Sequence, residues 1–389
     1  MTCTYCGSPD HAVESCPWHG TGHAPTAPSA AARRNQCSQS TTLEAIFPEE
    51  DTPESREGTA AHWAVSEQLS GRAVDVGLIA PNGVPLTDEM IDAADVMVND
   101  VTDTLALYGR EVRYGHVEQR VGMPRIHPTQ FGSPDYYNIV GPCGVRPVLL
   151  LWDFKYGHRH VDAFENDQMV DYLAGILEGF TDAEIIVRIV QPRSYSPSGP
   201  ISEWRTTLAA IQHLIERSSA AAHEALGPNP RARTGPECRD CRARHACPAL
   251  QARGFAGMDE AKRVTPLVME PAGACLELAL LDESIELMKA RRSGLALQVE
   301  AWARKGQPTP GWRLESGTAR ELWKVPAATV IAIGNAMRLD LAKPVEPITP
   351  TQARAAGLDP NIVAELAKRG PAGMSLVVDD GSKARPIFC

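Results

Sequence analysis

Apolar and polar residues form two different patterns between Gly58 and Ala225. Apolar residues recur every three to four positions in several segments, which predicts amphipathic helices. These segments are Gly58–Leu69, Asp88–Tyr108, Asn166–Leu177 and Glu203–Ala225. Thr59 and Thr87 are the expected N-caps of the first two helices, because a threonine side chain can accept a hydrogen bond from the first helical turn.

Short runs rich in β-branched, aliphatic and aromatic residues separate these helices and predict strands. They are Val112–Val121, Asp135–Val140, Val145–Lys155 and Ala183–Val190. The last run is apolar almost throughout, which is typical of a buried strand, and it follows a predicted helix. The sequence therefore predicts an α/β fold, with a mixed sheet flanked by helices and a last strand reached through a helical crossover.

Composition divides the chain into parts of different character. Residues 1–20 are rich in cysteine and histidine, and residues 21–32 read as a flexible Ala/Pro/Ser linker. Residues 33–255 carry the predicted α/β core. Residues 256–389 begin with a long amphipathic pattern over Leu276–Trp302, so this C-terminal region is expected to be helical.

Charge and hydropathy narrow the class of protein. The 389 residues include 48 Asp and Glu against 38 Lys and Arg, a net charge of −10, which argues against a protein coated in positive charge. A local basic groove can still bind nucleic acid. No apolar run approaches the ~18–20 residues of a membrane span, and the first residues lack the pattern of a secretion signal. We expect a cytoplasmic protein without membrane contact, whose 10 cysteines favour metal ligation over disulfides. Cys143, Cys275 and Cys389 lack partners at ligand spacing and are expected to be ordinary thiols.

Two aspartates and a lysine are the most informative residues for chemistry. Asp153 and Lys155 are two positions apart and therefore project from one face of a strand. Asp135 begins a neighbouring predicted strand and is expected to meet them. Carboxylates suit Mg²⁺ or Mn²⁺, a bound cation can activate water against a phosphate, and a lysine can orient that water. A strand end with solvated charges is the plainer alternative for the D-x-K pattern alone.

Further residues fit the same site, each with a structural alternative. Gln168 and Tyr172 are four apart on a predicted helix and share a face, where they could hold a phosphate or a base. A surface glutamine above a half-buried tyrosine is the plainer reading. His62 lies on the first predicted helix, where a lone histidine is usually structural. Glu118 is either a further metal-binding carboxylate or an ordinary surface residue.

Taken in order, these motifs resemble those of one nuclease family. The sequence contains G-x-x-x-H at Gly58–His62, P-D at Asp135, D-x-K at Asp153–Lys155 and Q-x-x-x-Y at Gln168–Tyr172. This order is similar to the RecB-like branch of the PD-(D/E)xK nuclease superfamily, in particular its phage and prophage members. The similarity covers roughly residues 33–250, and the order of the motifs is far more specific than any one of them.

The resemblance implies a restriction-endonuclease-like α/β core and a role for each motif. The implied roles are metal binding for His62, Asp135 and Asp153, catalysis for Asp135, Asp153 and Lys155, and binding of the DNA strand for Gln168 and Tyr172. Trp63 departs from the pattern, because relatives often carry an acid there. That departure leaves the presumed ligand His62 in place.

A second cysteine group follows the predicted core. Cys238-x2-Cys241-x5-Cys247 needs a fourth ligand, and Cys37 is the candidate. Four thiolates suit Zn²⁺, which the ligands alone slightly favour, or a 4Fe–4S cluster. One distant cysteine before the core and three after it are similar to the iron–sulfur staple of AddB-type and CRISPR-adaptation nucleases. That resemblance favours an iron–sulfur cluster with a structural role. Neighbouring arginines that could contact phosphates are Arg231, Arg233, Arg239, Arg242, Arg244 and Arg253.

The N-terminal island has the spacing of another metal site. Cys3-x2-Cys6-x4-His11-x4-Cys16 resembles a zinc knuckle, with His19 as a competing ligand. The segment is too short to form a core, so Zn²⁺ would have to hold its fold. Knuckles often bind single-stranded nucleic acid, and a zinc-stabilised cap without such contact is the alternative.

The combined motifs favour a metal-dependent DNA nuclease. We expect an exonuclease that acts on DNA ends in phage recombination or replication, in the cytoplasm of a bacterial host. Its expected partners are DNA and a phage single-strand annealing protein or recombinase. The alternative is a catalytically inactive nucleic-acid-binding module on the same fold, against which the intact Asp135, Asp153 and Lys155 argue. A third possibility, an assembly protein with metal staples, leaves those three residues unexplained.

Overall fold

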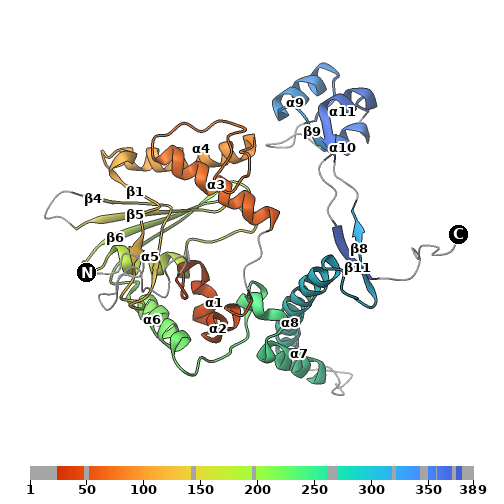
Figure 1. The fold of residues 1–389 in the computed structure, drawn as a ribbon. Coiled ribbons are helices and arrows are strands. Elements are labelled where there is room, and N and C mark those ends of the chain that lie inside the picture. The colour runs from red at the N-terminus through yellow and green to blue at the C-terminus, as the bar shows by residue number, and fades with distance from the viewer. Residues whose placement is uncertain are drawn as a thin grey trace. The chain divides into compact units, whose positions relative to one another are not determined.

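The computed structural model describes residues 24–47, 52–141, 146–194, 199–260, 270–317, 321–341, 349–355, 357–369 and 374–378. The predicted knuckle residues Cys3, Cys6, His11 and Cys16 lie outside these ranges. The chain divides into two compact units, Met1–Arg292 and Ser293–Cys389, so the boundary lies later than residue 255. The first unit contains the main sheet, and its elements are labelled in Figure 1.

A five-stranded mixed sheet forms the centre of the first unit. In spatial order its strands are β1 (His116–Val117), β4 (Tyr136–Val140), β5 (Val148–Phe154), β6 (Glu184–Val190) and β7 (Ile201–Thr207). β5 and β6 are parallel, and the other neighbouring pairs are antiparallel. The mixed sheet and the predicted strands that became β4, β5 and β6 are confirmed, with ends shifted by a few residues.

Helices cover both faces of this sheet because alternate residues of a strand point to opposite sides. The helices are α3 (Pro53–Leu69), α4 (Asp88–Leu107), α5 (Asp167–Ile176) and α6 (Gln212–Leu226). Leu149 and Leu151 share a core with α5 and α6, whereas Leu150 and Trp152 share a core with α3 and α4. Figure 1 shows the two helix pairs on opposite sides of the sheet. Asp153 has the same parity as Leu151 and therefore faces α5.

The starts of the first two helices are set by threonine caps. Thr87 caps α4 as predicted. α3 begins at Pro53, earlier than predicted, and its N-cap is Thr52, so the prediction of Thr59 was wrong. Thr52 and Ser55 exchange side-chain to backbone hydrogen bonds of 3.1 and 3.0 Å, a capping box. The first turn of α3 is polar and exposed, so the apolar periodicity did not reveal it.

The predicted helix Glu203–Ala225 was wrong over its first part. Its N-terminal residues belong to β7, which pairs antiparallel with β6, and α6 begins only at Gln212. The sheet therefore has one strand more than predicted, an antiparallel one at its edge. The predicted helical crossover, through α5 into β6, is confirmed. β7 is an edge strand, and of its residues only Trp204 is buried. An exposed edge strand lacks the apolar run that marked β6.

The predicted strand Val112–Val121 was also wrong in detail. This segment forms a 3-10 turn over Val112–Tyr114, which is followed by β1. Its last residue begins β2 (Val121–Gly122), which pairs with β3 (Phe131–Gly132) in a separate two-stranded sheet. At Gly115 a Cβ atom would lie 2.0 Å from the Tyr136 hydroxyl oxygen. The chain therefore passes too close to Tyr136 for any other residue at this position.

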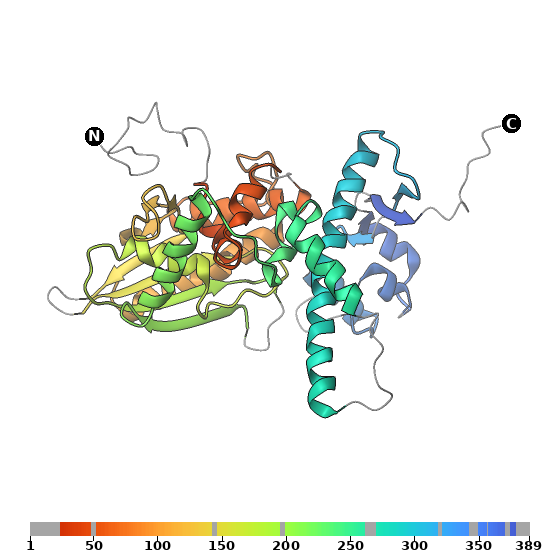
Figure 2. The same ribbon diagram turned by 90° about the horizontal axis from the view of Figure 1, so that it is seen from below.

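Residues 24–32 pack into the core, which contradicts the prediction of a flexible linker. Ala24, Thr26, Ala27 and Ala31 are buried. A 3-10 turn (Pro28–Ala30) leads into α1 (Ala31–Gln36), which is followed by α2 (Gln39–Glu44). Alanine and proline lose little side-chain entropy on burial, so the same composition suits close packing. In Figures 1 and 2, α1 lies beside α6, although the two helices are far apart in the sequence.

The segment after α6 is more ordered than the loop predicted for residues 228–253. Two 3-10 turns, Pro236–Arg239 and Arg242–His245, precede α7 (Pro248–Glu260). The long predicted helix is confirmed as α8 (Pro271–Arg304). Its buried residues include Leu287 and Ala290, which pack with Leu250 of α7. Much of the apolar stripe predicted for α8 is exposed instead: Leu278, Leu281, Ile285, Leu295 and Trp302.

The second unit is mixed and not purely helical as predicted. Its strand pairs are β8 (Trp312–Ser316) with β11 (Met374–Val378) and β9 (Glu321–Trp323) with β10 (Ala367–Arg369). Its complete helices are α9 (Ala327–Ala336), α10 (Pro350–Ala355) and α11 (Pro360–Leu366). Val330, Leu341 and Ala353 lie in its small core. In the parts of the chain that the structure describes, no helix is long and apolar enough to span a membrane.

Candidate metal centre

The predicted catalytic residues lie on separate elements that meet at one edge of the sheet. His62 lies in the middle of α3, and Glu118 follows β1. Asp135 immediately precedes β4, Asp153 is the penultimate residue of β5, and Lys155 follows that strand. The antiparallel pairing of β4 with β5 brings the start of one strand beside the end of the other, because Tyr136 is opposite Trp152.

Three of the predicted metal ligands form a compact group. His62 Nδ1 lies 3.3 Å from Asp135 Oδ1. One potential ligand atom each from His62, Glu118 and Asp135 lie within 4.8 Å of one another. The group combines two carboxylates with an imidazole. This is a donor set that a divalent cation accepts.

Asp153 lies beside this group and is held by polar side chains. Its Oδ2 is 2.8 Å from Lys155 Nζ, and its Oδ1 accepts a hydrogen bond of 3.1 Å from Gln168 Nε2. Gln168 Oε1 in turn accepts a 3.0 Å hydrogen bond from Lys155 Nζ. Gln168 therefore contacts both residues of the D-x-K motif. Gln168 thus lies beside the D-x-K motif, and its observed contacts are with protein groups.

Tyr172 lies one turn after Gln168 on α5, but its hydroxyl is engaged elsewhere. The hydroxyl donates a 3.1 Å hydrogen bond to the Ser133 carbonyl oxygen, just before the P-D motif. The ring is largely buried. Tyr172 thus supports the segment that leads into Asp135 and forms a wall beside the site.

Asp135 is fixed by backbone contacts as well as by His62. The Phe154 amide donates a 2.6 Å hydrogen bond to Asp135 Oδ2, and the Glu118 amide donates a 3.1 Å bond to the Asp135 carbonyl oxygen. Glu118 has a φ of 48°, in the left-handed region that non-glycine residues seldom adopt. This backbone conformation, uncommon outside glycine, occurs next to a group of potential ligands, as is frequent at functional sites.

The charges of His62 and Asp135 stabilise each other. Burial alone would lower the pKa of His62, but Asp135 raises it above its ordinary value. Burial alone would raise the pKa of Asp135, but His62 and the Phe154 amide bring it below its usual range. In the absence of a cation, the pair therefore favours a positive imidazole beside a negative carboxylate.

The ionised forms of the other two carboxylates, Asp153 and Glu118, are less well stabilised. Burial raises the pKa of Asp153, and repulsion from Asp135 adds to this, although Lys155 opposes it. Desolvation and repulsion from Asp135 raise the pKa of Glu118 to about 7. Burial alone would lower the pKa of Lys155, but Asp153 raises it, so the ammonium stays charged. A cation among these carboxylates would relieve their mutual repulsion.

The four predicted cluster cysteines gather in the first unit, away from this centre. Cys37 follows α1, and Cys238 lies in the first 3-10 turn. Cys241 immediately precedes the second turn, and Cys247 immediately precedes α7. All four line one pocket. The Arg233 amide donates to Cys37 Sγ over 3.4 Å, and the Gly235 amide donates to Cys238 Sγ over 3.4 Å. The pocket thus brings together Cys37, near the start of the core, and three cysteines that follow it in the sequence.

Burial in this pocket disfavours the charged thiolate form of the cysteines, which is the form that binds metals. Burial raises the pKa of Cys238, and burial followed by the nearby Glu44 raises that of Cys241 to about 12. Thiolates would need a compensating positive charge here, which a bound metal supplies. Several of the surrounding arginines are already paired with acids, through Arg231–Glu224, Arg233–Glu224, Arg239–Asp240 and Arg253–Glu283. These acids therefore neutralise part of the basic patch predicted from sequence.

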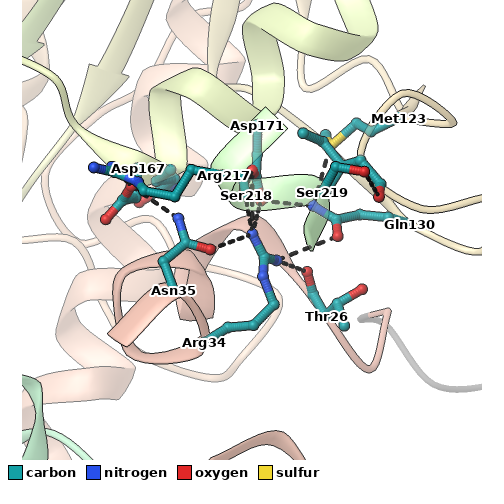
Figure 3. A network of polar contacts seen from close by, with 12 residues as sticks. Thr26, Arg34, Asn35, Met123, Gln130, Asp167, Asp171, Arg217, Ser218 and Ser219 are labelled. Atoms are coloured by element: carbon teal, nitrogen blue, oxygen red, sulfur yellow. Dashed lines mark hydrogen bonds and ion pairs between the residues drawn. The ribbon is translucent and has the colours of Figure 1, made fainter. Parts of the chain in front are cut away.

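A buried polar network that no sequence pattern predicted lies beside the site (Figure 3). Arg34 is fully buried and pairs with the equally buried Asp171 over 2.9 Å. Arg34 also donates to the Thr26 carbonyl oxygen, the Gln130 amide oxygen and the Ser218 hydroxyl. Asp171 lies on α5 between Gln168 and Tyr172, so the network anchors the helix that carries both. Nothing in the local pattern distinguishes Arg34 from the exposed arginines of the chain.

Fold and site together define an α/β protein with a histidine, carboxylates and a lysine at one sheet edge. The chain belongs to a family described as "Protein of unknown function (DUF2800)", which matches residues 23–366. The chain is also similar to the crystal structure of SSO0001, at 12% identity over 55% of this chain and 94% of the other. The TM-score of 0.21 is too low for this likeness to carry an argument.

Proposed function

We propose that this protein is a metal-dependent nuclease that hydrolyses phosphodiester bonds in DNA. The observation that carries the proposal is the convergence of His62, Glu118, Asp135, Asp153 and Lys155 from distant segments. Solvated charges at a strand end would not explain it, because Asp135 and Asp153 are buried. Buried carboxylates are costly unless they are paired or coordinate a cation.

The ligand atoms suit Mg²⁺ or Mn²⁺. His62, Glu118 and Asp135 would hold the cation, with Asp153 beside them. Carboxylates suit both ions, and the imidazole shifts the preference towards Mn²⁺. When bound, the cation would polarise the phosphate and lower the pKa of a coordinated water.

The remaining residues would position the reaction. Lys155 stays protonated beside Asp153, so its ammonium can contact a phosphate oxygen and offset charge that develops there. Gln168 holds Lys155 and Asp153 in fixed relation. We therefore assign Gln168 a positioning role and assign catalysis to Asp135, Asp153 and Lys155.

The resemblance to RecB-like nucleases supports DNA ends as the substrate. On that basis we propose an exonuclease of phage recombination or replication, acting in the host cytoplasm with a single-strand annealing protein or recombinase. The N-terminal zinc knuckle with Cys3, Cys6, His11 and Cys16 remains a prediction for nucleic-acid contact. The alternative of an inactive binding module predicts binding without cleavage.

The purified protein is expected to degrade end-labelled linear DNA in the presence of Mn²⁺ or Mg²⁺. Removing the cation with EDTA should stop cleavage, and adding Mn²⁺ should restore it, because the carboxylates alone cannot activate water against a phosphate. Covalently closed circular DNA of the same sequence is the control, and an exonuclease should leave it intact. Absence of cleavage of either DNA with both cations would contradict the proposed function.

We further propose that Cys37, Cys238, Cys241 and Cys247 bind a 4Fe–4S cluster. One zinc ion would hold its thiolates close together, at Zn–S distances of about 2.3 Å. Among the described residues, the tight group of three or more potential ligands is His62, Glu118 and Asp135, and the thiols are not gathered as closely. The resemblance to the iron–sulfur staple of AddB-type and CRISPR-adaptation nucleases is what favours a 4Fe–4S cluster over zinc here. The amide hydrogen bonds to the sulfurs of Cys37 and Cys238 would stabilise thiolate ligands.

Anaerobically purified protein should be brown, with broad absorption near ~400 nm and stoichiometric iron and sulfide, since a four-iron cluster needs all four thiolates. Cys37→Ser should remove the colour and lower the unfolding temperature, because it detaches α1 from the segment after α6. Cys275→Ser, at an exposed cysteine of α8, is the matched control and should keep both. A colourless protein that contains zinc instead of iron at this site would refute the cluster.

A further inference from the structure

The long helix α8 has two apolar sides, one of which packs against α7. Leu287 and Ala290 share a core with Leu250 of α7. α7 has 13 residues and α8 has 34, so α7 can cover only part of α8. On the other apolar side of α8, large side chains are 41–61% exposed, namely those of Leu278, Leu281, Ile285, Leu295 and Trp302. A helix that is apolar on more than one side is typically buried on each of them, so a partner is expected here.

The exposed side chains belong to a heptad repeat. Spacings of three and four residues alternate from Leu278 to Trp302, and with Leu278 at heptad position a, Arg292 is the only polar residue at an a or d position in this span. Leu287 and Ala290, which pack on α7, are at positions c and f and lie outside this row. A heptad pattern of more than three repeats is typical of a coiled-coil seam. We call this row the α8 seam; it consists of Leu278, Leu281, Ile285, Met288, Arg292, Leu295, Val299 and Trp302.

The α8 seam is large enough to form a stable interface. Its five exposed side chains present roughly 450 Å² of apolar surface, because a large side chain offers about 200 Å² when it is fully exposed. Exposed apolar patches of several hundred Å² are uncommon on monomers and often mark contact sites. α8 is about 50 Å long, and the polar residues that flank the seam would raise the buried area towards the ~800 Å² per partner of a standard interface.

The charges beside the seam fit a second copy of α8 that runs in the opposite direction. An antiparallel pair in which Ile285 of each copy lies opposite Met288 of the other is centred near the middle of the helix. Asp282 and Lys289 are both exposed and both at position e, and e positions face each other in an antiparallel pair. In this register Asp282 of one copy lies within about 3 Å, along the axis, of Lys289 of the second copy. Two-fold symmetry forms this attractive contact twice.

Arg292, the charged residue of the seam, favours the same arrangement. In the antiparallel register it lies opposite Leu281 of the second copy, and its aliphatic stem can pack there while its charge reaches Asp282 of that copy. In a parallel pair Arg292 would lie against Arg292 of the second copy, and Asp282 would lie beside Glu277. Like charges in these positions would oppose parallel association.

We propose that α8 pairs along the α8 seam with α8 of a second copy of this chain, as an antiparallel coiled coil, so that the protein is a homodimer. The contact is self-complementary and closes after two copies, as in most homodimers. The inference is independent of the proposed nuclease function, because the residues of the metal centre lie before α8 in the chain and outside it.

Ile285→Glu tests the seam. Sedimentation equilibrium of the full-length wild-type protein at about 10 µM should give twice the mass of one chain. Ile285 lies near the centre of the pair, so a carboxylate there should raise the dimer dissociation constant at least about a hundredfold. Leu297→Glu is the matched control, because Leu297 is also an exposed apolar residue of α8 but is at position f, away from the seam. Circular dichroism checks that both variants keep their helices.

A charge exchange tests the antiparallel register. Asp282→Lys and Lys289→Asp should each raise the dissociation constant about tenfold, because each places like charges opposite one another twice. Both substitutions in one chain should recover at least part of this loss, since opposite charges again face each other across the pair. The differences should shrink in 1 M salt, where exposed charges are screened.

The results decide both parts of the proposal. A wild-type protein that sediments as a monomer, or a dimer that survives Ile285→Glu, would overturn pairing through the α8 seam. A combined charge variant that associates no better than the single variants would overturn the antiparallel register. Dissociation by Ile285→Glu, an intact dimer in Leu297→Glu and recovery in the combined variant support the proposal.

Discussion

Asp153→Asn is expected to reduce DNA cleavage by at least about a thousandfold, while the protein remains folded. The substitution keeps the shape of the side chain and an oxygen that can accept the hydrogen bond from Gln168. It removes the negative charge beside the proposed cation and the partner of Lys155. Burial already raises the pKa of Asp153, so a neutral amide at this position should not weaken the fold. Initial cleavage rates at saturating Mn²⁺ measure the effect.

Asp182→Asn is the matched control for this experiment. Asp182 is an exposed carboxylate paired with Arg146, outside the site, so its replacement should leave the cleavage rate unchanged. Circular dichroism and urea denaturation of both variants check that folding is retained. A rate within a few-fold of wild type for Asp153→Asn would mean that any nuclease activity of the protein arises elsewhere.

Arg34→Met is expected to lower the free energy of unfolding by about 3–5 kcal/mol. Both Arg34 and Asp171 have fully buried side chains, so removing the guanidinium leaves a carboxyl group without its countercharge in the core. The substitution also removes the hydrogen bonds to Thr26, Gln130 and Ser218 (Figure 3). Burial already raises the pKa of Asp171, and without Arg34 this carboxyl should become protonated. Urea denaturation of wild type and variant measures the loss.

Arg217→Met is the matched control for the buried pair. Arg217 pairs with Asp167 over 2.6 Å on the same side of α5, but its side chain is half exposed. Exposed pairs contribute about 0–1 kcal/mol, so this variant should unfold almost as wild type does. A change of less than about 1 kcal/mol for Arg34→Met would show that the network does not hold α1 to α5 and α6.

The sequence alone located the features that depend on neighbouring residues. A strand has a period of two, so the spacing of Asp153 and Lys155 was enough to predict that they share a face, and their ion pair agrees. The threonine cap of α4 and the apolar run of β6 were found in the same way. Where a segment was half exposed, as in β7 and the first turn of α3, the local pattern failed because little apolar surface is buried there.

Only the tertiary structure decided which distant residues meet. His62 meets Asp135 because α3 packs beside the start of β4. Glu118 lies near them in an uncommon backbone conformation that no sequence pattern predicts. The Ala/Pro segment before α1 lies in the core, where Arg34 pairs with Asp171 and donates a hydrogen bond to the Thr26 carbonyl oxygen. Such contacts join positions far apart in the chain, and their energy depends on burial and on exact pairing of charges. Periodicity and composition carry no information on either, so these contacts appear only when the chain is folded.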